Sequence, residues 1–436
     1  MGPAAADDKL HRKVLWRIMP LLCAAYVVNY IDRTNISFAQ LQMADALSFS
    51  DAAFGLGAGV FFVGYALFEV PSNLLMTRWG ARKTFLRIMT LWGLMTLLTA
   101  FVSTPAQFYA ARFFLGVAEA GFAPGVLFYL GLWVPHRRVA HAMALFFAAF
   151  AASPIIAGPL AGMIMTLLDG AQGLRGWQWL FIIEGIPAIA LGFAAWRWLD
   201  DSPARAAWLS AEDKQALEKA LREDDSQGEV IGSLRQAARD PRLWLLGVIN
   251  FLILLGVYAL TFWQPRMLKD LGLSIWAIGF VSMIPAAIGV AAAILISRRS
   301  DRLGERRLHF AIPAVVAAVG LSLTVHAGGS VVAALICLSA ATAGLAAAMP
   351  VFWSVPNALL SRKAAAGGLA LINTIGITAG AAAPPLVGFV RASTGGFSAS
   401  LYLLSGALLL AAALMAFAYR APDHSASHAG ATPRAA

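Results

Sequence analysis

An acid and a base stand side by side in an apolar stretch near the start of the chain. The stretch "VVNYIDRTNISF" covers 27–38 and contains Asp32 and Arg33. Charged side chains are costly inside a bilayer and usually mark the pathway of an ion or a polar solute. Arginine keeps its charge, and its planar fork fits a carboxylate. We therefore expect Arg33 to bind an anion and Asp32 to help carry its counter-proton.

Ionisable residues inside the apolar stretches are confined to the first half of the chain. The set consists of Asp32, Arg33, Glu69, Arg112, Glu119 and Glu184. The corresponding stretches of the second half contain none. This asymmetry predicts that the first half handles charge and protons, whereas the second half offers neutral polar and aromatic contacts.

The spacing of these residues suggests how they pair. Arg112 and Glu119 are seven residues apart, about two helical turns, so both point the same way. Asp32 and Arg33 are about 100° apart around their helix and cannot make the same contact. We expect Asp32 to pair with Arg112, which would tune it, and Arg33 to face a cavity. A buried carboxyl without a close base can hold a proton near neutral pH, which makes Glu119 a second candidate for proton coupling.

Two alternatives accompany this assignment of roles. The buried charges can be purely structural pairs, and for Glu69 and Glu184 a structural or gating role is the preferred interpretation. Neutral substrate contacts are expected at Tyr30, Tyr258 and Trp353. Trp353 can equally be an interfacial or core residue.

The composition is that of a membrane protein. Of the 436 residues, 59% are hydrophobic and only 13% are charged, and the mean hydropathy is +0.71. A soluble domain has about 25% charged residues, and a helix needs about 20 apolar residues to cross a bilayer. We predict an all-α protein with twelve spans. The expected spans are 16–39, 52–76, 84–102, 105–132, 139–165, 179–199, 242–265, 275–297, 309–326, 331–358, 365–390 and 398–419.

The positive charges are distributed unevenly between alternate loops. One set includes both termini and 200–241. Together with the arginines at the adjoining span ends, such as Arg87, Arg197 and Arg420, it holds 27 of the 33 Lys and Arg residues. The other set holds four, and they are Arg175, Arg266, Lys269 and Arg391. The positive-inside rule then places both termini in the cytoplasm. The same distribution explains the net charge of +10 without nucleic acid as a partner.

The two halves of the chain repeat each other. "TRWGARK" at 77–83 matches "DRLGERR" at 301–307, and "AGPLAG" at 157–162 matches "APPLVG" at 383–388. Two six-helix bundles in a parallel repeat bind their substrate at the membrane midplane between them. The expected parts are a cytoplasmic N-terminus (1–15), the first bundle (16–199), a cytoplasmic linker (200–241), the second bundle (242–420) and a disordered cytoplasmic tail (421–436).

The repeated basic loops resemble the loop signature of the major facilitator superfamily. The first copy departs from it at Thr77, where an acid is usual, and at Ala81, where an arginine is common. The resemblance implies a gating role for Arg78, Gly80, Arg82, Asp301, Arg302, Gly304 and Arg306.

Further stretches resemble the anion:cation symporter family within that superfamily. These are "YIDRTNISFA" (30–39), "ARFFLGVAEAGFAPGVLFYLGLWVP" (111–135), "GWQWLFIIEGIPA" (176–188) and "FWSVPNALLSRKAAAGGLALINTIG" (352–376). The resemblance implies a bacterial inner-membrane symporter. Such proteins move tartrate-like hydroxy-diacids, sugar acids or aromatic carboxylates, usually with protons.

The resemblance also implies roles for individual residues. The acids of the "DR" and "AEAG" motifs, Asp32 and Glu119, would be proton sites. Arg33 would contact the substrate carboxylate, and Asn373 matches the family's "LIN" position. A neutral sugar or drug carrier of the same fold is the alternative function.

Other classes of protein find little support in the sequence. It contains no Walker loop, no zinc-ligand spacing and no G-x-S-x-G motif, so we expect neither an enzyme nor a cofactor or metal. Cys23 and Cys337 have no ligand spacing and are expected to fill the core. A receptor without transport is a further alternative. We expect a monomer surrounded by lipid.

The topology is tested by labelling single cysteines from outside. In a background without Cys23 and Cys337, a cysteine in 327–330 should react with an impermeant reagent in intact cells, and one in 220–228 should not. Lysed cells, in which both positions should react, provide the control. The opposite pattern would contradict every inside and outside assignment above.

Overall fold

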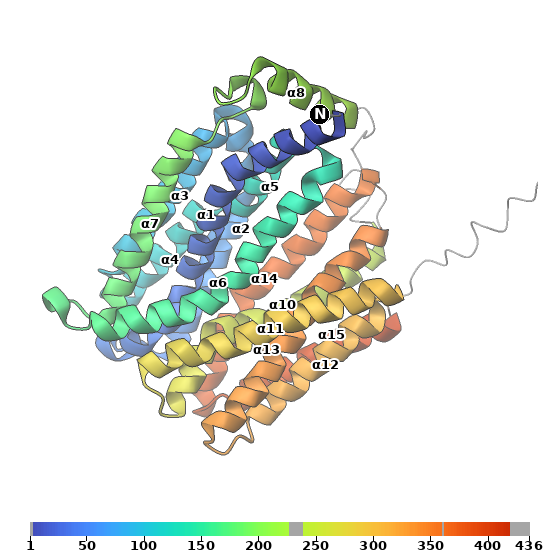
Figure 1. The fold of residues 1–436 in the computed structure, drawn as a ribbon. Coiled ribbons are helices and arrows are strands. Elements are labelled where there is room, and N and C mark those ends of the chain that lie inside the picture. Colours follow the sequence, from blue (N-terminus) through green and yellow to red (C-terminus); the bar gives the residue numbers. More distant parts are fainter. Residues whose placement is uncertain (1–2, 226–238, 360–361, 419–436) are drawn as a thin grey trace, which may run out of the picture.

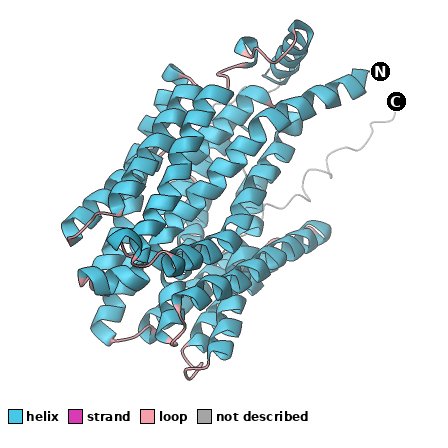
Figure 2. Cartoon of the chain, turned by 60° about the vertical axis from the view of Figure 1, so that its left-hand side comes forward, coloured by secondary structure: helices cyan, strands magenta, loops and turns pink. Residues whose placement is uncertain are grey.

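The computed structural model describes residues 3–225, 239–359 and 362–418. Within these ranges the chain consists of helices and connecting loops, and no strand is present (Figure 2). The expected all-α membrane fold is confirmed.

Seven helices build the first half of the chain, and two of them form one long kinked span. The seven are α1 (Pro3–Leu47), α2 (Asp51–Trp79), α3 (Ala81–Thr99), α4 (Pro105–Glu119), α5 (Phe122–Trp133), α6 (His136–Leu167) and α7 (Gly176–Trp198). The kinked span is formed by α4 and α5, which together cover Pro105–Trp133. A surface helix, α8 (Ala211–Asp225), then lies in the segment between the halves.

Six helices build the second half. They are α10 (Pro241–Asp270), α11 (Ile275–Leu303), α12 (Arg307–Thr324), α13 (Val331–Leu359), α14 (Arg362–Thr394) and α15 (Ser398–Ala413), which continues as a π-helical turn, Leu414–Ala418. The two halves are separate in colour in Figure 1, where blue to green helices form one bundle and yellow to red helices the other.

The predicted spans correspond to these helices. Eleven stretches are long and apolar enough to cross a bilayer among the described residues. The one predicted span that is not among these eleven, 84–102, coincides with α3, which packs between α4 and α7. Arg82, Lys83 and Arg87 lie in its first two turns and lower its mean hydropathy.

The bundles meet along α2 with α14, α6 with α11 and α1 with α10. Glycines let the backbones approach closely at this interface. A Cβ atom on Gly158 of α6 would lie 2.6 Å from the carbonyl oxygen of Gly279 of α11, and the reverse distance is the same. Such small-residue contacts bring helices together without bulky side chains between them.

The closest approaches between the bundles lie at one end of the interface. They involve Gly55, Gly59, Gly158, Gly162, Gly279, Gly380 and Gly388, all in the halves of their helices that face the start of α2. At the same end, Arg391 of α14 forms an ion pair with Asp51 of α2 and donates to Asp270 of α10 at 2.6 Å. Asp51 belongs to the first bundle, so this ion pair joins the two bundles.

Removing the carboxylate of Asp51 should loosen this end of the interface. Asp51→Asn leaves Arg391 with Asp270 of its own bundle and removes the charge that crosses to the other. A hydrogen bond to a charged group is worth about 1.5–3 kcal/mol, so the population separated at this end should rise about tenfold or more. Double electron–electron resonance between spin labels at Ser48 and Gly272 measures this separated population.

Asp45→Asn provides the matched control, because Asp45 is an exposed carboxylate near the same end of the first bundle. It should leave the distance distribution unchanged. An equal change in both variants would mean that Asp51 acts through surface charge rather than through Arg391.

Candidate functional site

An ion pair between α1 and α4 forms the centre of the site. Arg33 donates from Nε to Oε1 of Glu119 at 2.9 Å, and its Nη2 forms a second bond to the same oxygen. The Glu119 side chain is fully buried, whereas 22% of the Arg33 side chain is exposed. The expected layout was therefore wrong in one respect. Glu119 does have a close base, and that base is Arg33.

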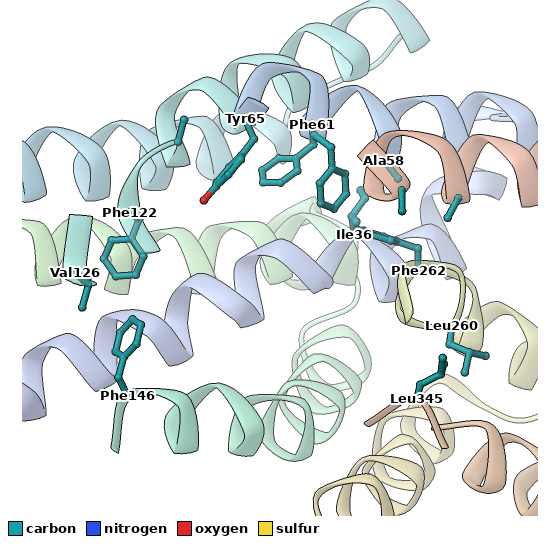
Figure 3. Packing of buried hydrophobic residues seen from close by; sticks show 14 of the residues in the cluster. Ile36, Ala58, Phe61, Tyr65, Phe122, Val126, Phe146, Leu260, Phe262 and Leu345 are labelled. Carbon is teal, nitrogen blue, oxygen red and sulfur yellow. The ribbon is translucent and has the colours of Figure 1, made fainter. Parts of the chain in front are cut away.

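Aromatic rings of α2 hold the Arg33 guanidinium in place. Its central carbon lies 5.3 Å from the ring centroid of Phe61 and 5.3 Å from that of Tyr65. Figure 3 shows Phe61 and Tyr65 side by side on α2, with the Tyr65 hydroxyl extending into the first bundle. A cation over an aromatic face is stabilised by the ring quadrupole. The rings therefore support the charge while leaving part of the fork accessible.

Asp32 faces a different neighbour. Its Oδ2 accepts from the Thr96 hydroxyl of α3 at 2.6 Å, and its Oδ1 accepts from Asn35 Nδ2 at 3.0 Å. The carboxyl is 1% exposed. The expected ion pair with Arg112 is not formed among the described residues. The step of about 100° from Asp32 to Arg33 turns one side chain to α3 and the other to α4.

Arg112 lies in the same region without a hydrogen bond. The residue is completely buried, and none of its three side-chain nitrogens has a hydrogen-bond partner among the described residues. Its guanidinium carbon is 5.0 Å from the ring centroid of Phe61, the ring that Arg33 also contacts. A buried cation without a bonded partner is costly. The site therefore contains one arginine with an ion-pair partner and one without a hydrogen-bond partner among the described residues.

The helix carrying Glu119 breaks directly after it. Glu119 is the last residue of α4, and Gly121 adopts a left-handed conformation with φ +87° before α5 begins. A Cβ atom at Gly121 would lie 2.6 Å from Ser72 Oγ. The sequence predicted a single span over 105–132, and the break was not expected. The signal was present in "AEAGFAPG", where glycine and proline follow the acid. Interrupted membrane helices commonly build solute sites.

Two of the expected neutral contacts lie close to the ion pair. Tyr30 interacts electrostatically with Arg33, and Tyr258 of α10 interacts with both Arg33 and Glu119. Tyr258 also packs edge-on against Phe62 of α2, with the ring centroids 4.7 Å apart. Both tyrosines are partly exposed. The structure thus brings a residue of the second bundle to the charged site of the first.

Trp353 and Asn373 lie on other helices of the second bundle. Trp353 of α13 packs edge-on against Phe352, with centroids 5.4 Å apart. Asn373 is exposed in the middle of α14. Neither makes a described contact with Arg33 or Glu119, and their role as substrate contacts stays a prediction.

The first basic loop is tied to the end of α7. The backbone N–H of Arg82 donates to the Asp201 carboxylate at 3.0 Å, and its guanidinium donates to the Trp196 carbonyl at 2.9 Å. Gly80 has φ +83°, and a Cβ atom there would meet Asp201. Arg78 is exposed. Asp201 therefore supplies an acid to a loop that lacks one at Thr77, which the sequence did not predict.

The second basic loop is held by its own residues. Arg306 pairs with Asp301 at 2.6 Å, and Gly304 adopts φ +63° at the end of α11. Arg302 is exposed. Both loops are anchored within their own bundles, and their gating role stays a prediction.

Comparisons with known proteins agree with this architecture. A model of the Major Facilitator Superfamily matches residues 22–384. A protein of Agrobacterium vitis named "Putative tartrate transporter" is 41% identical over 93% of this chain and 94% of its own. A protein of Acinetobacter baumannii named "Quinolone resistance transporter" is 39% identical over 94% of each chain. The xylose transporter XylE from E. coli, in a partially occluded inward-open conformation, shares the fold, with a TM-score of 0.73 at 14% identity over 92% of this chain and 97% of XylE.

Proposed function

Because the chain belongs to the Major Facilitator Superfamily, we propose that it is a secondary transporter that carries a small organic anion together with protons. The observation that carries this proposal is the buried pair between Arg33 and Glu119, in which the arginine is partly exposed and the acid is not. The transporter would lie in a bacterial inner membrane as a monomer with cytoplasmic termini, and it would import its substrate.

The pair couples the anion to a proton by competition for one cation. While Glu119 is ionised, it occupies the N–H groups of Arg33 that a substrate carboxylate would need. A proton on Glu119 removes its charge and releases the guanidinium, which then binds the carboxylate through its fork. Because the linkage is reciprocal, the bound anion also favours the proton. Anion and proton therefore load together.

The coupling also suits the membrane potential. Moving one negative charge into a cell that is negative inside costs about 2.3 kcal/mol per 100 mV. A proton carried with each negative charge cancels this term. Asp32 is the second candidate for a proton, and Arg112 is the nearby cation that would respond to its charge. Arg112 would thereby tune coupling rather than hold the substrate.

The neutral parts of the substrate would meet the second bundle. Tyr258 lies next to the pair, and Trp353 and Asn373 are placed on helices of that bundle. Tyr30 would complete the site from α1. The glycine contacts between α6 and α11 allow the bundles to rock against each other, as alternating access requires.

A hydroxy-diacid related to tartrate is the substrate class we favour, followed by sugar acids and aromatic acids. The name of the Agrobacterium vitis relative supports it. A drug or neutral sugar carrier is the second candidate, and the name of the Acinetobacter baumannii relative supports a drug. The two differ in their need for Arg33, because a neutral solute has no carboxylate to engage the fork.

Glu119→Gln tests the coupling in proteoliposomes. The amide mimics a permanently protonated acid, so exchange of labelled tartrate should survive while accumulation driven by an acid exterior should fail. Binding of the anion should also lose its dependence on pH, whereas in the native protein it should strengthen as the pH falls. Accumulation against a gradient by this variant would reject Glu119 as the obligatory coupling site. Uptake of a neutral sugar but of no carboxylate by the native protein would favour the second candidate.

Arg33→Lys tests the carboxylate clamp. Lysine keeps a positive charge but loses the planar fork. Loss of one charge-assisted bond, worth about 1.5–3 kcal/mol, weakens affinity roughly 10- to 150-fold. Arg112→Lys is the matched control at the other buried arginine. It should shift the pH dependence more than the affinity. The measurement is substrate affinity against pH for both variants, and near-native affinity in Arg33→Lys would move the clamp to Arg112.

A further inference from the structure

Glu184 of α7 is a buried carboxyl that the mechanism above leaves without a role. The residue is 4% exposed, and α7 packs against α3 and α1. Neither of its carboxyl oxygens has a hydrogen-bond partner among the described residues. No Lys, Arg or His among the described residues forms an ion pair with Glu184. The polar groups that face it are the amide of Asn35 and, beyond that amide, the carboxylate of Asp32.

The packing of α7 on α3 fixes the depth of this carboxyl. Gly185, the next residue, lies against Gly93 of α3, and a Cβ atom on Gly93 would be 2.7 Å from the Gly185 carbonyl oxygen. The backbones are therefore in close contact beside Glu184.

An ionised carboxylate in this position would be expensive. Burial of a charge without a counter-ion or hydrogen-bond donors costs at least several kcal/mol. The nearest charged group that acts on Glu184 is Asp32, which has the same sign and opposes ionisation further. A neutral carboxylic acid avoids both costs. It also has an O–H group, which needs an acceptor.

That acceptor is present on Asn35. Its Nδ2 donates to Asp32, but its Oδ1 is buried and has no donor among the described residues. The other oxygen of Asp32 already accepts from Thr96. The group of polar atoms is thus short of a donor, because Asn35 Oδ1 and both oxygens of Glu184 are buried acceptors without a donor among the described residues. A proton on Glu184 supplies the missing donor.

We propose that Glu184 is a proton-binding site, connected through Asn35 to Asp32 and distinct from the pair of Arg33 and Glu119. The row Glu184, Asn35, Asp32 and Thr96 runs from α7 across α1 to α3. In it a proton on Glu184 removes the like charge that would otherwise face Asp32. The role of this proton in transport rests on the proposed function, but its presence on Glu184 does not.

The infrared spectrum of the purified, lipid-reconstituted protein tests the site at neutral pH. A protonated carboxyl gives a carbonyl band that carboxylates and amides lack. Glu184→Gln should remove one such band, because glutamine keeps the shape without the acid. Glu119→Gln is the matched control and should leave the band, because Glu119 forms an ion pair with Arg33. A spectrum unchanged by Glu184→Gln would overturn the proposal.

Asn35→Ala tests the connection. If the Glu184 O–H donates to Asn35 Oδ1, loss of the acceptor should move the band to higher wavenumber and keep its area. An unmoved band would overturn the link to Asp32. Thermal unfolding of each variant shows whether it is folded, and Glu184→Leu offers a second neutral replacement should the glutamine variant fail to fold. A band that depends on Glu184 in a protein without proton-coupled uptake would reject the proposed function alone. Proton-coupled uptake with no such band would reject this site alone.

Discussion

The balance of charge inside the first bundle constrains the rest of the site. Two arginines and three carboxyls are buried or nearly buried there, in a region where an uncompensated charge costs several kcal/mol. Arg33 is neutralised by Glu119, Asp32 is held by neutral donors, and Arg112 lies over the Phe61 ring without a hydrogen bond among the described residues. Any change in this balance must come from a proton or an anion, because the cations cannot lose their charge.

The local backbone serves this balance. Asp32 and Arg33 are neighbours on α1 and differ by about 100° in direction, so their side chains point toward different helices. The break at Gly121 ends α4 at Glu119, which places the acid at a joint instead of inside a rigid helix. The Phe61 ring of α2 lies near both arginines without adding charge. Each feature lowers the cost of keeping ions in an apolar bundle.

The sequence was sufficient for the architecture and for the identity of the charged residues, but not for their partners. Apolar runs and the repeat of "TRWGARK" predicted twelve spans in two bundles, because run length and period are properties of the chain itself. Partner choice depends on the rotation of each helix against its neighbours. The 100° step therefore predicted that Asp32 and Arg33 diverge, yet not that Thr96 and Glu119 receive them. Asp201 was missed for the same reason.

The division of charge between the bundles has a mechanical consequence. The ion pair of Arg33 with Glu119 and the row from Glu184 to Thr96 are contained in the first bundle, whereas the contact of Arg391 with Asp51 crosses between bundles at one end. Rocking of the bundles can break the crossing contact without separating the buried pairs. The second bundle offers Tyr258 to the site, and its buried Arg391 lies at the end of α14 where it pairs with Asp51. A solute that binds between Arg33 and the second bundle would therefore link the movement of the bundles to the charge balance of the first. A substrate that neutralises Arg33 from that side provides this link.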